Sequence, residues 1–206
     1  MPSENDPNST TAPENGPANS SARTWTARDI ETILRQRGWL KIECDAGLEA
    51  WLAEAAALLS RSTGNTAVEV EARSHPEAEQ SREALADLMN LIFQYDAEES
   101  LARIQSHIVL ARAGSRAVIR ELANRVLEGP EIDSNRYKLL LEGLEQTVGF
   151  SGRGLLHPVR LALAGRAGED ELDGVILLID RAAGLPFAVA VKSTRQRILE
   201  FCAAMD

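Results

Sequence analysis

Several features are scarce in this chain of 206 residues, and each absence excludes a class of protein. Two cysteines, Cys44 and Cys202, are too few for a disulfide framework or a zinc site of four thiolates. No apolar run approaches the roughly 18–20 residues that span a bilayer, and the N-terminus lacks the basic and then apolar pattern of a secretory signal. We therefore expect a cytoplasmic protein with no membrane partner.

Basic charge is also in short supply. The chain has 22 Lys and Arg against 31 Asp and Glu, which gives a formal net charge of −9. A protein that coats nucleic acid without sequence preference needs a basic surface, so the overall charge argues against that class. The deficit is uneven along the chain, because residues 151–206 hold seven basic and seven acidic residues.

Catalytic and cofactor motifs are missing as well. The chain has no phosphate loop of the Walker type, no G-x-G-x-x-G and no G-x-S-x-G. The histidines His75, His107 and His157 stand far apart, and none has a partner at metal-ligand spacing. The run Gly152-Arg153-Gly154 fits a flexible turn between helices better than a phosphate cradle. We expect no catalytic residue, no metal site and no cofactor.

The first 22 residues differ in composition from the rest. They contain four of the eight prolines and no Lys, Arg or aromatic residue. Such a segment cannot bury enough apolar surface to offset its loss of conformational entropy on folding. Residues 1–22 are therefore predicted to be a disordered tail.

From residue 23 onward the apolar residues recur at helical spacing, and strand patterns are almost absent. Thr26 and Asp29 resemble a capping box at a helix start, and Gly38 stands where that helix should end. Residues 60–76 interrupt the pattern and predict a loop or a short extended piece. The sequence thus predicts an all-α protein of eight or nine helices in two packed bundles. We divide it into an N-terminal helical segment (23–75), a helical bundle (76–150) and a C-terminal helical subdomain (151–206).

The most informative stretch starts at Phe150. It reads Phe-Ser-Gly-Arg-Gly-Leu-Leu-His-Pro-Val-Arg-Leu-Ala-Leu-Ala-Gly-Arg up to Arg166, and Glu171-Leu172 follow shortly after. This stretch resembles the C-terminal anticodon-binding region of bacterial, discriminating-type glutamyl-tRNA synthetases. There a G-x-K/R-G-x-L linker leads into P-[LIV]-R-x-A-L-T-G-R. Residues 91–98 are similar to an aromatic-rich segment of the same family.

The resemblance implies a helical anticodon-binding fold that binds tRNA or another structured RNA. Arg160 and Leu172 would then contact bases, and the phosphate contacts would come from Arg166, Lys192, Arg195 and Arg197. Pro158 is expected in the first turn of the helix that carries Arg160, and Gly165 at its end. A purely structural alternative for Arg160 and Arg166 is a pair of ion pairs between helices.

Two departures from the family bear on function. The chain has neither the H-I-G-H nor the K-M-S-K-S motif of the catalytic half, so we expect no synthetase activity. Glu169 and Asp170 stand where the family has a small turn near the anticodon, and two carboxylates oppose an approaching phosphate. The sequence thus predicts a free-standing anticodon-binding-domain-like protein of translation. The alternative is a helical module that kept the fold, lost the RNA and binds a protein partner in an apolar groove between the bundles.

Overall fold

The computed structural model describes the backbone of residues 25–62, 75–168 and 171–205, and the side chains of 25–60, 82–168 and 171–205. These parts form ten helices and no strand, which confirms the predicted all-α class. The predicted tail, residues 1–22, lies outside the described residues. The helices are α1 (Ala27–Gln36), α2 (Ala46–Ser62), α3 (His75–Phe93), α4 (Ala97–Ala102), α5 (Ile104–Leu110), α6 (Ser115–Glu128), α7 (Ser134–Val148), α8 (Arg153–Ala164), α9 (Glu171–Ala183) and α10 (Thr194–Met205).

The described residues form more helices than the eight or nine expected, because one predicted helix is divided into α4 and α5. Arg103 has extended backbone angles (φ −74°, ψ 138°) and separates α4 from α5. Hydroxyl groups replace the missing helical hydrogen bonds there, since Ser106 donates to the carbonyl of Ser100. The predicted loop over 60–76 is also too long, because α2 reaches Ser62 and α3 begins at His75.

The predicted helix caps are confirmed. The Thr26 hydroxyl accepts from the backbone N–H of Asp29 (3.2 Å), and the Asp29 carboxylate accepts from the N–H of Thr26 (3.0 Å). Gly38 and Gly165 have φ of 74° and 75°, the left-handed conformation that ends a helix without a steric penalty for glycine.

Pro158 is not at a helix start, which corrects the expectation from sequence. The helix α8 begins five residues earlier, at Arg153, after Gly152 with φ 52°. Pro158 has no backbone N–H, so the helix lacks the hydrogen bond that residue 158 would otherwise donate to the carbonyl of Gly154. The early start places Arg153 and His157 one turn apart on the same helix.

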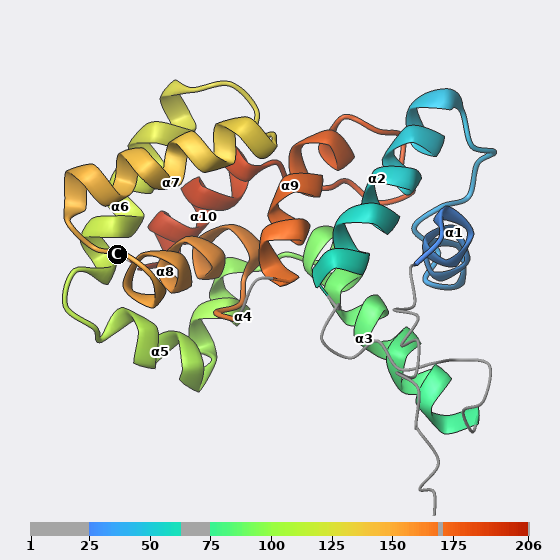
Figure 1. Cartoon of the computed structure of the whole chain (residues 1–206), viewed down its shortest axis with the longest axis horizontal. Coiled ribbons are helices and arrows are strands. Elements are labelled where there is room, and N and C mark those ends of the chain that lie inside the picture. Colours follow the sequence, from blue (N-terminus) through green and yellow to red (C-terminus); the bar gives the residue numbers. More distant parts are fainter. Residues whose placement is uncertain (1–24, 63–74, 169–170, 206) are drawn as a thin grey trace, which may run out of the picture.

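The helices form two groups joined by α9 (Figure 1). In the view of Figure 1, α1, α2 and α3 lie on the right, and α4 to α8 with α10 lie on the left. Helix α9 contacts α2 and α3 on one side and α8 and α10 on the other. One cluster of buried apolar residues runs through both groups, so they share a core.

Aromatic side chains hold the right-hand group to the connection between α9 and α10. Trp39 stacks on Phe93 at 4.6 Å between ring centroids, and Phe187 meets Phe93 edge-on at 4.9 Å. The indole N–H of Trp51 donates to the carbonyl of Leu178 in α9 (3.2 Å). A tryptophan buried with its N–H satisfied contributes its full apolar area to the core.

Candidate nucleic-acid interface

Arg160, the central residue of the predicted RNA site, lies inside the protein with 2% of its side chain exposed. Its guanidinium forms a bidentate ion pair with Asp173 of α9, at 2.8 Å from Nε to Oδ1 and 2.7 Å from Nη2 to Oδ2. Its Nη1 donates to the carbonyl of Gly168 (2.8 Å). The side chain therefore ties α8 to α9, as in the structural alternative for this residue.

The same carboxylate has a third partner. The hydroxyl of Tyr137 in α7 donates to Asp173 Oδ1 (2.7 Å). Burial, together with the negative charge of Asp173, raises the pKa of Tyr137 well above its usual range. The phenol stays neutral and keeps its proton for this hydrogen bond, so Asp173 joins α7, α8 and α9.

Arg197 is fully buried and has no contact with the solvent. Its guanidinium donates to the carbonyls of Leu91 and Leu163, each at 2.9 Å, and to that of Ile92. These carbonyls belong to the last turns of α3 and α8, which have no intrahelical donor. Burial lowers the pKa of Arg197 to about 10, which leaves the side chain charged at neutral pH. A cation at two helix C-termini is also favoured by the helix dipoles.

Leu172 is fully buried as well. Because Arg160, Leu172 and Arg197 are buried, a base or phosphate would reach them only if the core opened. They position the helices around the predicted site instead.

The other three predicted contacts are at the surface but have partners within the protein. Arg166 lies 3.7 Å from Glu171, Lys192 lies 2.7 Å from Glu200, and Arg195 donates to the carbonyl of Gly129 (2.6 Å). Surface ion pairs are worth about 0–1 kcal/mol and exchange readily. These side chains are accessible to RNA but do not form one basic patch, since carboxylates lie among them. Glu169 and Asp170 lie outside the described residues.

A second set of arginines forms a surface that the sequence reasoning missed. Residues 100–120 contain four arginines and no Asp or Glu, and residues 146–168 contain three arginines and again no Asp or Glu. Four exposed members of this set form the surface that we call the basic face: Arg112, Arg116, Arg120 and Arg153. Long stretches without acidic residues in an acidic chain were the signal that could have located them.

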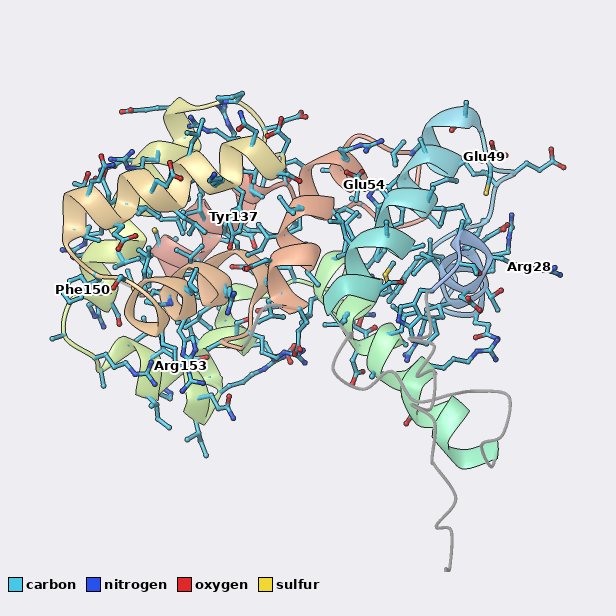
Figure 2. The ribbon with its side chains drawn as sticks, in the orientation of Figure 1. Arg28, Glu49, Glu54, Tyr137, Phe150 and Arg153 are labelled. Carbon is cyan, nitrogen blue, oxygen red and sulfur yellow. The ribbon has the colours of Figure 1, made fainter. Side chains whose placement is uncertain are left out.

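The two stretches meet where α6 and α8 begin. Gly114 caps α6, and a Cβ at this position would overlap the ring of Phe150, so Phe150 lies directly against the turn before α6. Arg112 Nη1 lies 3.2 Å from His157 Nδ1, and Arg153 precedes His157 by one turn of α8. Figure 2 shows Phe150 and Arg153 on this side of the molecule, at the end far from Arg28.

The helix starts add to the positive potential of the basic face. Neither α6 nor α8 has an acidic residue in its first turn, and neither glycine cap has a side chain that accepts a hydrogen bond from that turn. A helix N-terminus carries about half a positive charge. The basic face thus combines exposed arginines with two helix N-termini, and the stretches that form it contain no Asp or Glu. These features favour an anionic partner.

A cleft of about 730 Å³ lies between the two helix groups. It is bordered by Glu54 of α2, by Asp180 and Arg181 of α9, and by the segment from Pro130 to Arg136. Asp180 is occupied, since it accepts from the backbone N–H groups of Ile132 (2.8 Å) and Thr194 (2.7 Å). Apolar side chains also line the cleft, among them Ile132, Leu139 and Leu177.

Within the described ranges, no three His, Cys, Asp or Glu side chains gather in a way that could hold a metal ion. No helix in those ranges is long and apolar enough to cross a membrane. Comparisons with models of protein families, with curated proteins and with solved structures find no match to this chain.

Proposed function

We propose that the protein binds a structured RNA, such as a tRNA, through the basic face. The observation that carries this proposal is the grouping of Arg112, Arg116, Arg120 and Arg153 on a surface formed by stretches that lack Asp and Glu. In a chain of net charge −9, such a surface is the part most able to attract a polyanion.

The side-chain chemistry of the basic face suits phosphate. Guanidinium groups pair with phosphate oxygens in a bidentate manner, and arginine keeps its charge at any physiological pH. Backbone N–H groups in the first turn of α6 can donate hydrogen bonds to the same oxygens. The acidic remainder of the surface restricts where RNA can lie, because it repels phosphate elsewhere.

The buried arginines support this surface from below. Arg160 holds α8 against α9, and Arg197 holds the ends of α3 and α8. Both keep the start of α8, with Arg153, in a fixed place relative to α6. The motif that resembles the anticodon-binding region therefore supplies the framework of the site, and the RNA contacts come from residues beside it.

The test is a titration of tRNA against the purified full chain over a range of salt concentrations. The triple variant Arg112→Ala/Arg116→Ala/Arg153→Ala is expected to weaken binding at least tenfold at low salt. It should also lower the slope of log K against log salt by about 2, since each lost phosphate contact contributes roughly 0.7–0.9 to that slope.

A variant of equal charge provides the control. Arg28, Arg37 and Lys41 are also exposed, and they belong to α1 and the segment after it, at the far end of the molecule. The variant Arg28→Ala/Arg37→Ala/Lys41→Ala should bind tRNA almost as the parent does. Equal losses in both variants would mean that net charge alone is sensed, and the absence of binding by the parent at low salt would refute the proposal.

The alternative function, a helical protein-interaction module, is favoured by a different observation. Two isoleucines of α5 are strongly exposed beside the basic face. A protein partner at α5 is compatible with RNA on the arginines, and neither requires the other.

A further inference from the structure

Phe150 is an aromatic residue at the centre of the basic face. Its ring lies on the backbone of Gly114, because a Cβ at position 114 would overlap the Cε2 and Cζ atoms of the ring. A Cβ at Gly154, in the first turn of α8, would lie 3.9 Å from the Cβ and Cδ1 of Phe150. The ring is therefore held where the turn before α6 meets the start of α8.

Phe150 differs from the other aromatic residues of the described chain. Phe187 is partly exposed, and its ring meets those of Trp51 at 5.1 Å and Phe93 at 4.9 Å. Phe150 is also partly exposed, but within the described residues it packs against no second aromatic ring. The other seven are buried in the core: Trp25, Trp39, Trp51, Phe93, Tyr95, Tyr137 and Phe201. Phe150 is thus the aromatic side chain whose ring is both exposed in part and unstacked.

Three arginines of the basic face are close to this ring along the chain. Arg112 and Arg116 are each two residues away from Gly114, on which the ring lies, and Arg153 follows Phe150 by three residues. All three arginines are exposed. The ring therefore lies between two chain segments that each carry exposed guanidinium groups.

The two stretches that form the basic face contain no Asp or Glu, so acidic residues only border them in the chain. Among these bordering residues, Glu99 is paired with Arg103 at 2.8 Å and Glu121 with Arg125 at 2.7 Å. Glu145 is exposed near the end of α7, five residues before Phe150. A nucleotide at the ring thus meets chain segments whose charged side chains are basic.

We infer that the Phe150 ring stacks on an unpaired base of the bound RNA, and that the protein selects RNA loops over RNA duplex. Proteins that bind single-stranded nucleic acid combine basic side chains for the backbone with aromatic rings for the bases. A duplex offers its phosphates to the arginines, but its bases are stacked on one another within the helix and leave no face for the ring. The inference rests on the proposed function and names the part of the RNA that is recognised.

The experiment compares two RNAs of equal phosphate number, a stem closed by an unpaired loop and a fully paired duplex, in titrations of the full chain at low salt. Equal charge removes most of the electrostatic difference between the two RNAs. We expect the hairpin to bind at least about tenfold more tightly than the duplex. The variant Phe150→Leu keeps an apolar side chain against Gly114, and it should lose at least about fivefold in affinity for the hairpin and nothing for the duplex.

The matched control is Phe187→Leu, which removes a ring from the aromatic cluster beside α2 and should keep the full preference for the hairpin. Thermal unfolding of both variants gives the temperature range in which each is folded, and binding is measured within it. Photo-crosslinking tests the parent protein without any substitution. With 5-iodouridine in the loop, irradiation should join the RNA to the peptide that contains Phe150.

The outcomes separate this inference from the proposed function. No binding of either RNA at low salt would refute both. Equal binding of hairpin and duplex, with the expected loss in the Arg112→Ala/Arg116→Ala/Arg153→Ala variant, would leave RNA binding standing and refute the stacking on Phe150. A folded Phe150→Leu protein that keeps the full preference for the hairpin, or a cross-link that maps outside the peptide with Phe150, would refute the stacking as well.

Discussion

Arg160 and Arg197 show how much the environment of a residue decides its role. Both carry the charge that an RNA-binding site needs, and both use it inside the protein, one with a carboxylate and one with helix-end carbonyls. A buried charge whose partner is removed is costly, so each arginine is expected to matter more for stability than for binding.

The first prediction concerns Arg160. Arg160→Ala should lower the free energy of unfolding by about 3–5 kcal/mol, because it leaves Asp173 as a poorly compensated charge. The double variant Arg160→Leu/Asp173→Leu should be less damaged than Arg160→Ala, since it removes both charges. Urea unfolding measures these differences. A tRNA titration of the folded Arg160→Ala protein should match the parent, and a specific loss of affinity there would restore Arg160 as an RNA contact.

The second prediction concerns Tyr137 and pH. Tyr137→Phe should cost about 1–3 kcal/mol at pH 7, the worth of a hydrogen bond to a charged group. The pKa of Tyr137 is raised in the folded state, whereas an unfolded tyrosine ionises near pH 10. The stabilisation is therefore complete below about pH 10 and declines above it.

The measurement is urea unfolding of the parent and Tyr137→Phe at pH 7 and again near pH 11. The difference in stability between the two proteins should shrink at the higher pH. A difference that stays constant or grows with pH would show that Tyr137 does not keep its proton for Asp173.

At the scale of the element, two helices end at a glycine in the left-handed conformation. Gly165 ends α8 with φ 75°, and Gly149 ends α7 with φ 72°. At both positions a residue other than glycine would be strained in the left-handed conformation. The surroundings of the two glycines differ, however. A Cβ at Gly165 would lie 2.8 Å from the Ser100 hydroxyl, and one at Gly149 would meet nothing within 4 Å.

The third prediction uses this pair. Gly149→Ala should cost about 1 kcal/mol from backbone strain alone. Gly165→Ala should cost more, about 2 kcal/mol or above, because the contact with Ser100 adds to the same strain. Thermal or urea unfolding of both variants checks the order. Equal losses would indicate that the end of α8 does not pack closely against α4.

At the scale of the whole molecule, the two helix groups share one core through α9. All three tryptophans, Trp25, Trp39 and Trp51, belong to the group of α1 and α2, whereas helices occur throughout the described chain. Tryptophan fluorescence thus reports one group, and far-ultraviolet circular dichroism reports both.

The fourth prediction is that the two signals change together in urea, with one midpoint and one slope. Burial of Trp51 against α9 and stacking of Trp39 on Phe93 couple the groups, so unfolding one exposes apolar surface of the other. A fluorescence transition at lower urea than the circular dichroism transition would show that the two groups unfold as separate units.

Local features of the molecule were determined by the sequence itself. The capping box of Thr26 and Asp29 and the left-handed glycines Gly38 and Gly165 are where the residues predict them. The helical class follows for the same reason. These features depend on residues within four positions of one another, so no knowledge of packing is needed to foresee them.

Tertiary structure decided which charged residues face the solvent. The pairing of Arg160 with Asp173 spans 13 residues, and that of Arg197 with the carbonyl of Leu91 spans more than 100. Helical periodicity cannot foresee such partners, because they come together only when α3, α8, α9 and α10 pack. The same packing brings the start of α6 against Phe150 and gathers the basic face from two distant stretches. The sequence alone shows that both stretches lack Asp and Glu. Only the fold brings them together on one surface.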